Sequence, residues 1–174
     1  MTTQTTANNR YAASQMTGIP KETKRLAADA AGIAEAAKIL CAGGLVAFPT
    51  ETVYGLGADA RNGEAVARVF EAKGRPSFNP LIVHVSGLEM AERYGVLNQQ
   101  ARDLVGDSWP VAVSIVVGWR PGTDFWPRVT AGPPSVALRV AQTEFARKFL
   151  AGFDGPSAAP TANPTGKISP TTAP

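Results

Sequence analysis

Gly44-Leu-Val-Ala-Phe-Pro-Thr-Glu-Thr-Val-Tyr-Gly-Leu-Gly57 is the stretch of sequence that decides the fold. It begins with a short apolar run, Leu45 to Phe48, which Pro49 ends because proline cannot donate to a sheet ladder. The run is therefore predicted to be a buried strand, followed by a hydroxyl-rich loop over residues 50–60. Ligands of open α/β sheets usually bind at this edge, where a strand ends.

Helix and strand patterns mix along the rest of the chain. Apolar residues at helical spacing, with capping residues at the ends, predict helices over residues 27–42, 62–74, 86–94, 98–106 and 143–151. In the third of these, Ser86 and Glu89 have the spacing of a capping box. β-Branched runs predict further strands over residues 81–85, 112–117 and 136–140. We therefore expect an α/β domain on one open, twisted, mixed sheet with flanking helices.

Composition limits the class of protein. The chain has 174 residues, 44% of them apolar and 18% charged, which indicates one globular domain. Its 17 glycines and 14 prolines disfavour an all-helical bundle. The net charge of +3 is too small for a polybasic nucleic-acid coat but allows a local cationic cleft for phosphate.

Single cysteine and histidine residues exclude several kinds of site. With only Cys41 and His84, neither an internal disulfide nor a His/Cys zinc site can form. The sequence also contains neither an apolar run of membrane-spanning length nor a secretory signal, so we expect a cytoplasmic protein that does not enter a membrane. Residues 1–24 are expected to be a disordered tail, and residues 25–174 to be the domain.

Two exposed cations are predicted at the end of a helix, where Lys73-Gly74-Arg75 gives way to an extended segment. Side chains two residues apart on an extended segment face the same way, so Lys73 and Arg75 could grip one triphosphate. Alternatively, they only complement the helix dipole.

Other polar residues also allow two interpretations. His84 lies in an apolar strand, where it is either a hydrogen-bonded wall residue or a functional group. Arg139 also lies in a strand, so it needs an anionic partner or must face a cleft. The proline-punctuated loop from Thr161 to Ser169 either contacts a nucleotide or is a solvated turn, and no helix or strand is predicted after residue 157.

Four segments in a fixed order resemble the YrdC-like threonylcarbamoyl-adenylate synthase family. They are residues 44–57, Lys73-Gly-Arg-Pro76, Asn79-Pro-Leu-Ile-Val-His-Val85 and Ala159-Pro-Thr-Ala-Asn163. The resemblance extends from about residue 25 to the end, and it implies a YrdC-like sheet with a concave cationic cleft. It also implies a nucleotidyltransferase that makes threonylcarbamoyl-AMP and pyrophosphate from L-threonine, bicarbonate and ATP, with Mg²⁺. A separate transferase complex would then carry the threonylcarbamoyl group to tRNA.

The resemblance also implies roles for individual residues. Those expected to contact ATP are Arg75, Asn79, Ser135, Thr161, Asn163 and Ser169. Those expected to contact threonine are Thr52, His84, Arg139 and Ala159, with Arg139 holding the carboxylate. Lys73 and Arg75 are the expected catalytic pair, and no protein ligand to a metal is expected.

Three departures from the family pattern carry further expectations. Trp109-Pro-Val-Ala-Val-Ser114 replaces the family's Trp-Pro-Gly-Pro-Leu-Thr and is expected to reshape one cleft wall. Thr161 replaces the signature serine. The family continues past Ser169-Pro-Thr-Thr172 into further structure, so we expect a domain that lacks its C-terminal end, with a mobile loop over residues 161–169 and low activity.

Two alternative functions remain open at this point. A catalytically weak member of the same fold could bind double-stranded RNA or tRNA, because a concave cationic cleft also suits an RNA backbone. A carbamoyl-adenylate domain of the hydrogenase-maturation type is the other alternative.

Overall fold

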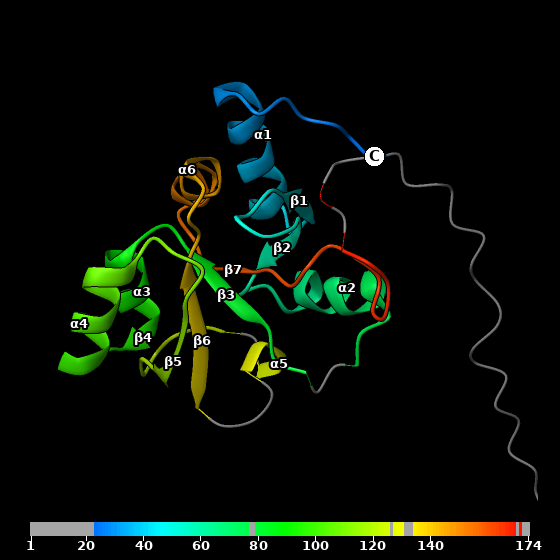
Figure 1. Ribbon diagram of the computed structural model, residues 1–174. Coiled ribbons are helices and arrows are strands. Elements are labelled where there is room, and N and C mark those ends of the chain that lie inside the picture. Colours follow the sequence, from blue (N-terminus) through cyan, green and yellow to red (C-terminus); the bar gives the residue numbers. More distant parts are fainter. Residues whose placement is uncertain (1–22, 77–78, 126, 131–133, 170, 172–174) are drawn as a thin grey trace, which may run out of the picture.

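One mixed sheet organises the computed structural model, which describes residues 23–76, 79–125, 127–130, 134–169 and 171 (Figure 1). The strands are β1 (Val46–Phe48), β2 (Gly55–Asp59), β3 (Ile82–Val85), β4 (Gly95–Val96), β5 (Ser114–Trp119), β6 (Ser135–Val140) and β7 (Ser157–Ala158). Across the described part of the chain they lie in the order β1-β2-β7-β3-β6-β5-β4. β3 and β6 are parallel and the other neighbouring pairs are antiparallel. The expected α/β fold on an open mixed sheet is confirmed.

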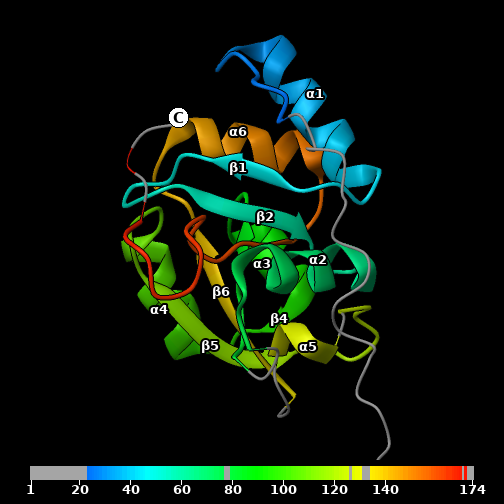
Figure 2. The same ribbon diagram turned by 90° about the vertical axis from the view of Figure 1, so that its right-hand side faces the viewer.

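Helices cover both faces of this sheet. They are α1 (Ala30–Cys41), α2 (Gly63–Lys73), α3 (Leu88–Tyr94), α4 (Gln99–Ser108), α5 (Pro127–Thr130) and α6 (Glu144–Phe153). Because side chains alternate along a strand, Val136, Leu138 and Val140 of β6 share one face, where they pack with buried residues of α2, α3 and α4. The opposite face packs against α1 and α6, which lie at the same end of the molecule in Figures 1 and 2.

Local capping signals predicted most helix ends correctly. The carboxylate of Asp29 accepts the N–H of Gly32 at 2.8 Å and begins α1. Asn62 caps α2 through the N–H groups of Glu64 and Ala65, and Gly74 ends α2 in the left-handed conformation with φ 57°. Asn98 and Thr143 cap α4 and α6 in the same way.

The predicted loop over residues 50–60 is wrong in its second half, which forms β2. Gly57 is needed for close packing of β2 and not for a turn. A Cβ on Gly57 would lie 2.7 Å from Oγ of Ser157 and 2.9 Å from Cε1 of Phe48. The missed strand β7 is the partner of β2, so the expectation of no strand after residue 157 is also wrong.

Two shorter predictions also need correction. Ser86 does not cap α3: Gly87 occupies the cap position without a side-chain bond, and the Ser86 hydroxyl contacts Sδ of Met90 at 3.7 Å. β5 begins at residue 114, not 112, because Nε1 of Trp109 donates to the carbonyl of Val113 at 3.0 Å and closes a turn there.

The predicted tail falls almost wholly outside the described residues, since residues 1–22 are not among them. Within the described ranges, no helix is both long and apolar enough to cross a membrane.

Candidate functional site

Three polar side chains form a row across the middle of the sheet. His84 on β3 lies opposite Arg139 on parallel β6 and opposite Ser157 on antiparallel β7. Directly paired residues point to the same face, so these three side chains, which we call the polar row, are neighbours on the face that carries α1 and α6. Ala159 lies beside the row, and its N–H donates to the carbonyl of Ile82 at 3.0 Å.

Part of this face is open. Ser135 precedes Arg139 by four residues on β6, so it shares the face at a distance of about 13 Å along the strand. On the neighbouring strand β5, Val116 is paired with Ala137 between these two residues and is 71% exposed. Among the described residues, this face of β5 and β6 is therefore partly exposed between Arg139 and Ser135.

His84 is buried and neutral at pH 7. Only 5% of it is exposed, and burial, with the nearby positive charge of Arg139, lowers its pKa to about 4. The Phe48 ring packs edge-on against the imidazole, with the ring centroids 6.2 Å apart. Nδ1 of His84 is buried and has no hydrogen-bond partner. The imidazole can therefore form a hydrogen bond with a ligand, but it is not a cation at neutral pH.

Arg139 has an anionic partner that the sequence did not reveal. Its Nη2 donates to Oε1 of Glu51, whose other oxygen accepts the N–H of Gln142 at 3.2 Å. Both side chains are largely buried, with 15% of Arg139 and 8% of Glu51 exposed. Burial raises the pKa of Glu51, but the N–H groups of Glu51 and Gln142 and the charge of Arg139 outweigh it and lower the pKa overall. The ion pair is thus formed, while Nε of Arg139 stays buried and unpartnered.

Glu51 and Ser157 are site residues that sequence reasoning missed, and only Glu51 had a signal in the sequence. The available signal was a carboxylate between two threonines, directly past a buried strand. The long separation of Glu51 from Arg139 in the chain hid their pairing.

Lys73 is not the exposed helix-end cation expected from the sequence. It is 3% exposed, and Nζ donates to the carbonyls of Thr161 and Asn163. Its own carbonyl accepts the N–H of Thr165 at 2.8 Å. Burial, together with the positive charge of Arg75, lowers the pKa of Lys73. Lys73 thus joins the end of α2 to the C-terminal loop, which lies beside α2 in Figure 1.

The loop over residues 160–169 is anchored to β2 as well. The N–H of Ala162 donates to the carbonyl of Tyr54 at 2.7 Å, and Thr161 forms an isolated bridge with Gly55. Within the loop, Nδ2 of Asn163 donates to the carbonyl of Lys167 at 2.6 Å, and the Ser169 hydroxyl donates to Oδ1 of Asn163 at 3.2 Å. These contacts give no support to the expected mobility of this loop, whose red trace runs across Figure 2.

Three further residues predicted from the sequence, Arg75, Asn79 and Thr52, lie outside the polar row and the C-terminal loop. Arg75 follows α2; its Nη2 donates to the carbonyl of Pro80 at 3.2 Å, and its buried Nε has no partner. The N–H of Asn79 donates to the carbonyl of Pro76 at 3.2 Å. Thr52 is exposed next to Glu51. The structure thus gathers His84, Arg139 and Ala159 in one group, and Lys73, Thr161, Asn163 and Ser169 in a second.

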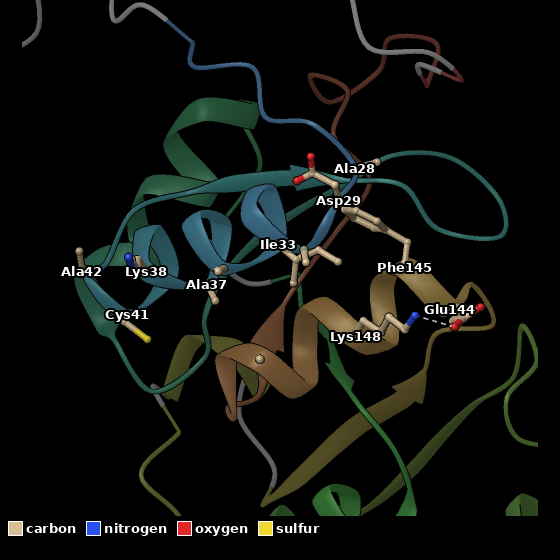
Figure 3. Close-up of a pocket in the computed structure, with 13 residues that line it drawn as sticks. Ala28, Asp29, Ile33, Ala37, Lys38, Cys41, Ala42, Glu144, Phe145 and Lys148 are labelled. Atoms are coloured by element: carbon tan, nitrogen blue, oxygen red, sulfur yellow. Dashed lines mark ion pairs between the residues drawn. The ribbon is translucent and has the colours of Figure 1, made fainter.

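A groove of about 1080 Å³ lies elsewhere, between α1 and α6 (Figure 3). Alanines, Ile33 and Phe145 form much of its lining, and Glu144 pairs with Lys148 at its edge. None of the residues singled out from the sequence as binding or catalytic lines it. The polar row is the better candidate site because it holds buried polar atoms that lack partners. The concave cationic cleft stays a prediction.

The described residues offer no metal cage. No three His, Cys, Asp or Glu side chains gather within them, and Glu51, beside the polar row, is already engaged with Arg139. Mg²⁺ is commonly held by one or two carboxylates plus substrate phosphates. The residues present therefore fit an ion carried by a nucleotide better than an ion resident in the protein.

Comparison with known proteins shows which family this chain resembles. Residues 38–174 match the Sua5–YciO–YrdC family model, described as telomere recombination. A threonylcarbamoyl-AMP synthase of Bacillus subtilis (strain 168) is 44% identical over 152 residues, which cover 87% of this chain and 44% of that protein. One from Halorhodospira halophila is 35% identical, with 78% of this chain and 70% of that protein covered.

A solved structure matches the fold as well. The crystal structure of Pyrococcus abyssi Sua5 complexed with L-threonine has a TM-score of 0.78 and 41% identity, and the match covers 86% of this chain and 43% of that one. This chain therefore spans less than half the length of the Bacillus and Pyrococcus proteins.

Proposed function

The chain belongs to the Sua5–YciO–YrdC family, and from this premise we propose that it is the synthase domain of an L-threonylcarbamoyladenylate synthase. In the proposed reaction, the amine of L-threonine combines with bicarbonate to give a carbamate and water. A carbamate oxygen then attacks the α-phosphate of ATP, and pyrophosphate leaves. The threonylcarbamoyl-AMP formed would serve tRNA modification through a separate transferase complex.

The observation that carries this proposal is that each residue of the polar row has a buried polar atom without a partner, Oγ of Ser157 included. Nδ1 of His84 and Nε of Arg139 are both buried and unpartnered, and their residues are directly paired across β3 and β6. Leaving a buried polar group unsatisfied costs about 1–3 kcal/mol, which a bound ligand offsets by supplying the missing hydrogen bonds. A carboxylate suits Arg139, and the amino acid's other polar groups lie within reach of His84 and Thr52 in this proposal.

ATP is proposed to bind from the polar row toward the C-terminal loop and Ser135. Arg75 would contact phosphate through its unpartnered Nε, while Asn79, Thr161 and Ser169 supply neutral hydrogen bonds. Lys73 would act by holding Thr161 and Asn163 in place, because its ammonium is already bound to their carbonyls. When bound with ATP, Mg²⁺ would neutralise phosphate charge. Such a site promotes phosphoryl chemistry through positioning and charge and needs no strong base.

Calorimetry with L-threonine and a non-hydrolysable ATP analogue tests the proposal. We expect saturable binding of both ligands, and pyrophosphate release from ATP that depends on threonine and on bicarbonate. Lys38→Ala is the control and should bind both ligands as the wild type does, since Lys38 is an exposed lysine in the last turn of α1 and does not belong to the polar row. Salt-sensitive binding of double-stranded RNA without any threonine binding would instead support the RNA-binding alternative.

A further inference from the structure

Glu51 binds one nitrogen of the Arg139 guanidinium and leaves another nitrogen without a partner. Nη2 of Arg139 donates to Glu51, whereas Nε is buried without a partner. A guanidinium is a planar fork whose N–H groups point in fixed directions. Holding one of its nitrogens therefore restricts the direction of the unpartnered Nε–H.

Glu51 is itself held rigidly. Its second carboxylate oxygen accepts the N–H of Gln142 at 3.2 Å, and only 8% of its side chain is exposed. Gln142 lies directly before Thr143, the N-cap of α6, whose hydroxyl lies 3.5 Å from the carbonyl of Pro49. The loop that carries Glu51 is thus fastened to the start of α6, just beyond the end of β6.

The free N–H of Arg139 belongs to the polar row. His84 is directly paired with Arg139 on the neighbouring strand, and its unpartnered Nδ1 is also buried. His84 is neutral, so the charge of Arg139 is the only full charge that the polar row offers a ligand, and Glu51 is the group that balances it. The orientation of Arg139 therefore governs how an anionic ligand is received.

We propose that Glu51 is a positioning residue, which holds the Arg139 guanidinium so that its Nε–H, on the residue paired with His84, receives the carboxylate of the amino-acid substrate. The identity of this ligand rests on the proposed function, whereas the effect of Glu51 on Arg139 does not. Glu51 acts through Arg139 and does not itself contact the substrate.

Glu51→Gln separates this role from a merely structural one. The amide keeps the size of the side chain but loses its charge, and its NH₂ group accepts no hydrogen bond, so Arg139 and Gln142 no longer have one acceptor oxygen each. Glu51→Asp keeps the charge but is one methylene shorter, so it cannot reach both partners at once. Glu71→Gln is the matched control, because Glu71 is exposed on α2.

The first measurement follows the Arg139 Nε–H signal by ¹H–¹⁵N NMR in the ligand-free protein, assigned by its loss in Arg139→Lys. We expect a resolved, slowly exchanging signal in the wild type and in Glu71→Gln. In Glu51→Gln we expect it to move to the averaged position of exposed arginines. An unchanged signal in both Glu51 variants would overturn the proposal.

The second measurement compares ligand affinities by calorimetry. A hydrogen bond to a charged group contributes enough that we expect threonine to bind Glu51→Gln at least about tenfold more weakly, with ATP affinity within about twofold of the wild type. Glu51→Asp should fall between them, which keeps the test available if Glu51→Gln does not fold. Tighter threonine binding by Glu51→Gln would show Glu51 to be an internal competitor and refute positioning. If the wild type binds no threonine, the proposed function fails, and the NMR signal still decides the role of Glu51.

Discussion

Replacing Lys73 by methionine removes the charge that joins α2 to the C-terminal loop while keeping the length of the side chain. In the wild type Lys73 is 3% exposed, and its ammonium donates to the carbonyls of Thr161 and Asn163. A hydrogen bond to a charged group contributes about 1.5–3 kcal/mol, so two give about 3–6 kcal/mol. Removing a buried ammonium also removes its desolvation cost, which leaves a net loss of about 2–4 kcal/mol.

Thermal unfolding measures this loss. For a chain of this size, 1 kcal/mol lowers Tm by about 2–4 °C, so we expect Lys73→Met to melt about 5–15 °C below the wild type. Lys38→Met is the matched control: it removes an exposed lysine from the last turn of α1, and helix-dipole contacts of that kind contribute about 0.3–1 kcal/mol. Hydrogen exchange at the N–H of Thr165, which bonds the Lys73 carbonyl, should quicken in Lys73→Met. Equal Tm values for the two lysine variants would refute the structural role of Lys73.

Three further predictions concern the polar row and its surroundings. His84 is the chain's sole histidine, and its pKa is about 4 when folded against 6.5 when unfolded, so stability present above pH 6.5 is lost as the pH falls toward 4. Urea unfolding should show a loss of about 2 kcal/mol between pH 7.5 and pH 5 that is absent from His84→Asn. Arg139→Met should abolish threonine binding and lower the free energy of unfolding by about 3–5 kcal/mol, because it leaves Glu51 unpaired. The double variant with Glu51→Met should regain stability but not binding. Full additivity of the two stability changes would contradict this. Gly57→Ala should lower the free energy of unfolding by about 1–3 kcal/mol, because its Cβ overpacks against Oγ of Ser157. The loss should be smaller when Ser157 is also replaced by alanine. An equal loss with and without the Ser157→Ala change would show that this contact is not the cause.

Elements defined by local signals were predictable from the sequence. The side-chain caps Asp29, Asn62, Asn98 and Thr143 and the left-handed Gly74 each act within one helical turn of their own position. Short runs of β-branched and other apolar residues likewise predicted β3 and β6. Local hydrogen bonds and side-chain spacing are properties of short segments, so these features do not depend on the rest of the fold.

Elements defined by pairing were not predictable in this way. β7 is two residues long and is a strand only because β2 and β3 flank it. Gly57 is typical of a loop in the sequence, yet packing against Phe48 and Ser157 requires it within β2. Pairing partners far apart in the chain leave little trace in local composition, which is why β2 and β7 were mistaken for loop.

The sequence by itself determined the fold class, most helix ends and the residue types of the candidate site, because these depend on propensity, capping and motif order. Only the tertiary structure decided what the charged residues do. It paired Arg139 with Glu51, which are 88 residues apart in the chain, and it buried Lys73 against carbonyls of the C-terminal loop. The energy of a charge depends on its burial and on its nearest partner in space, and neither is present in the linear order of residues.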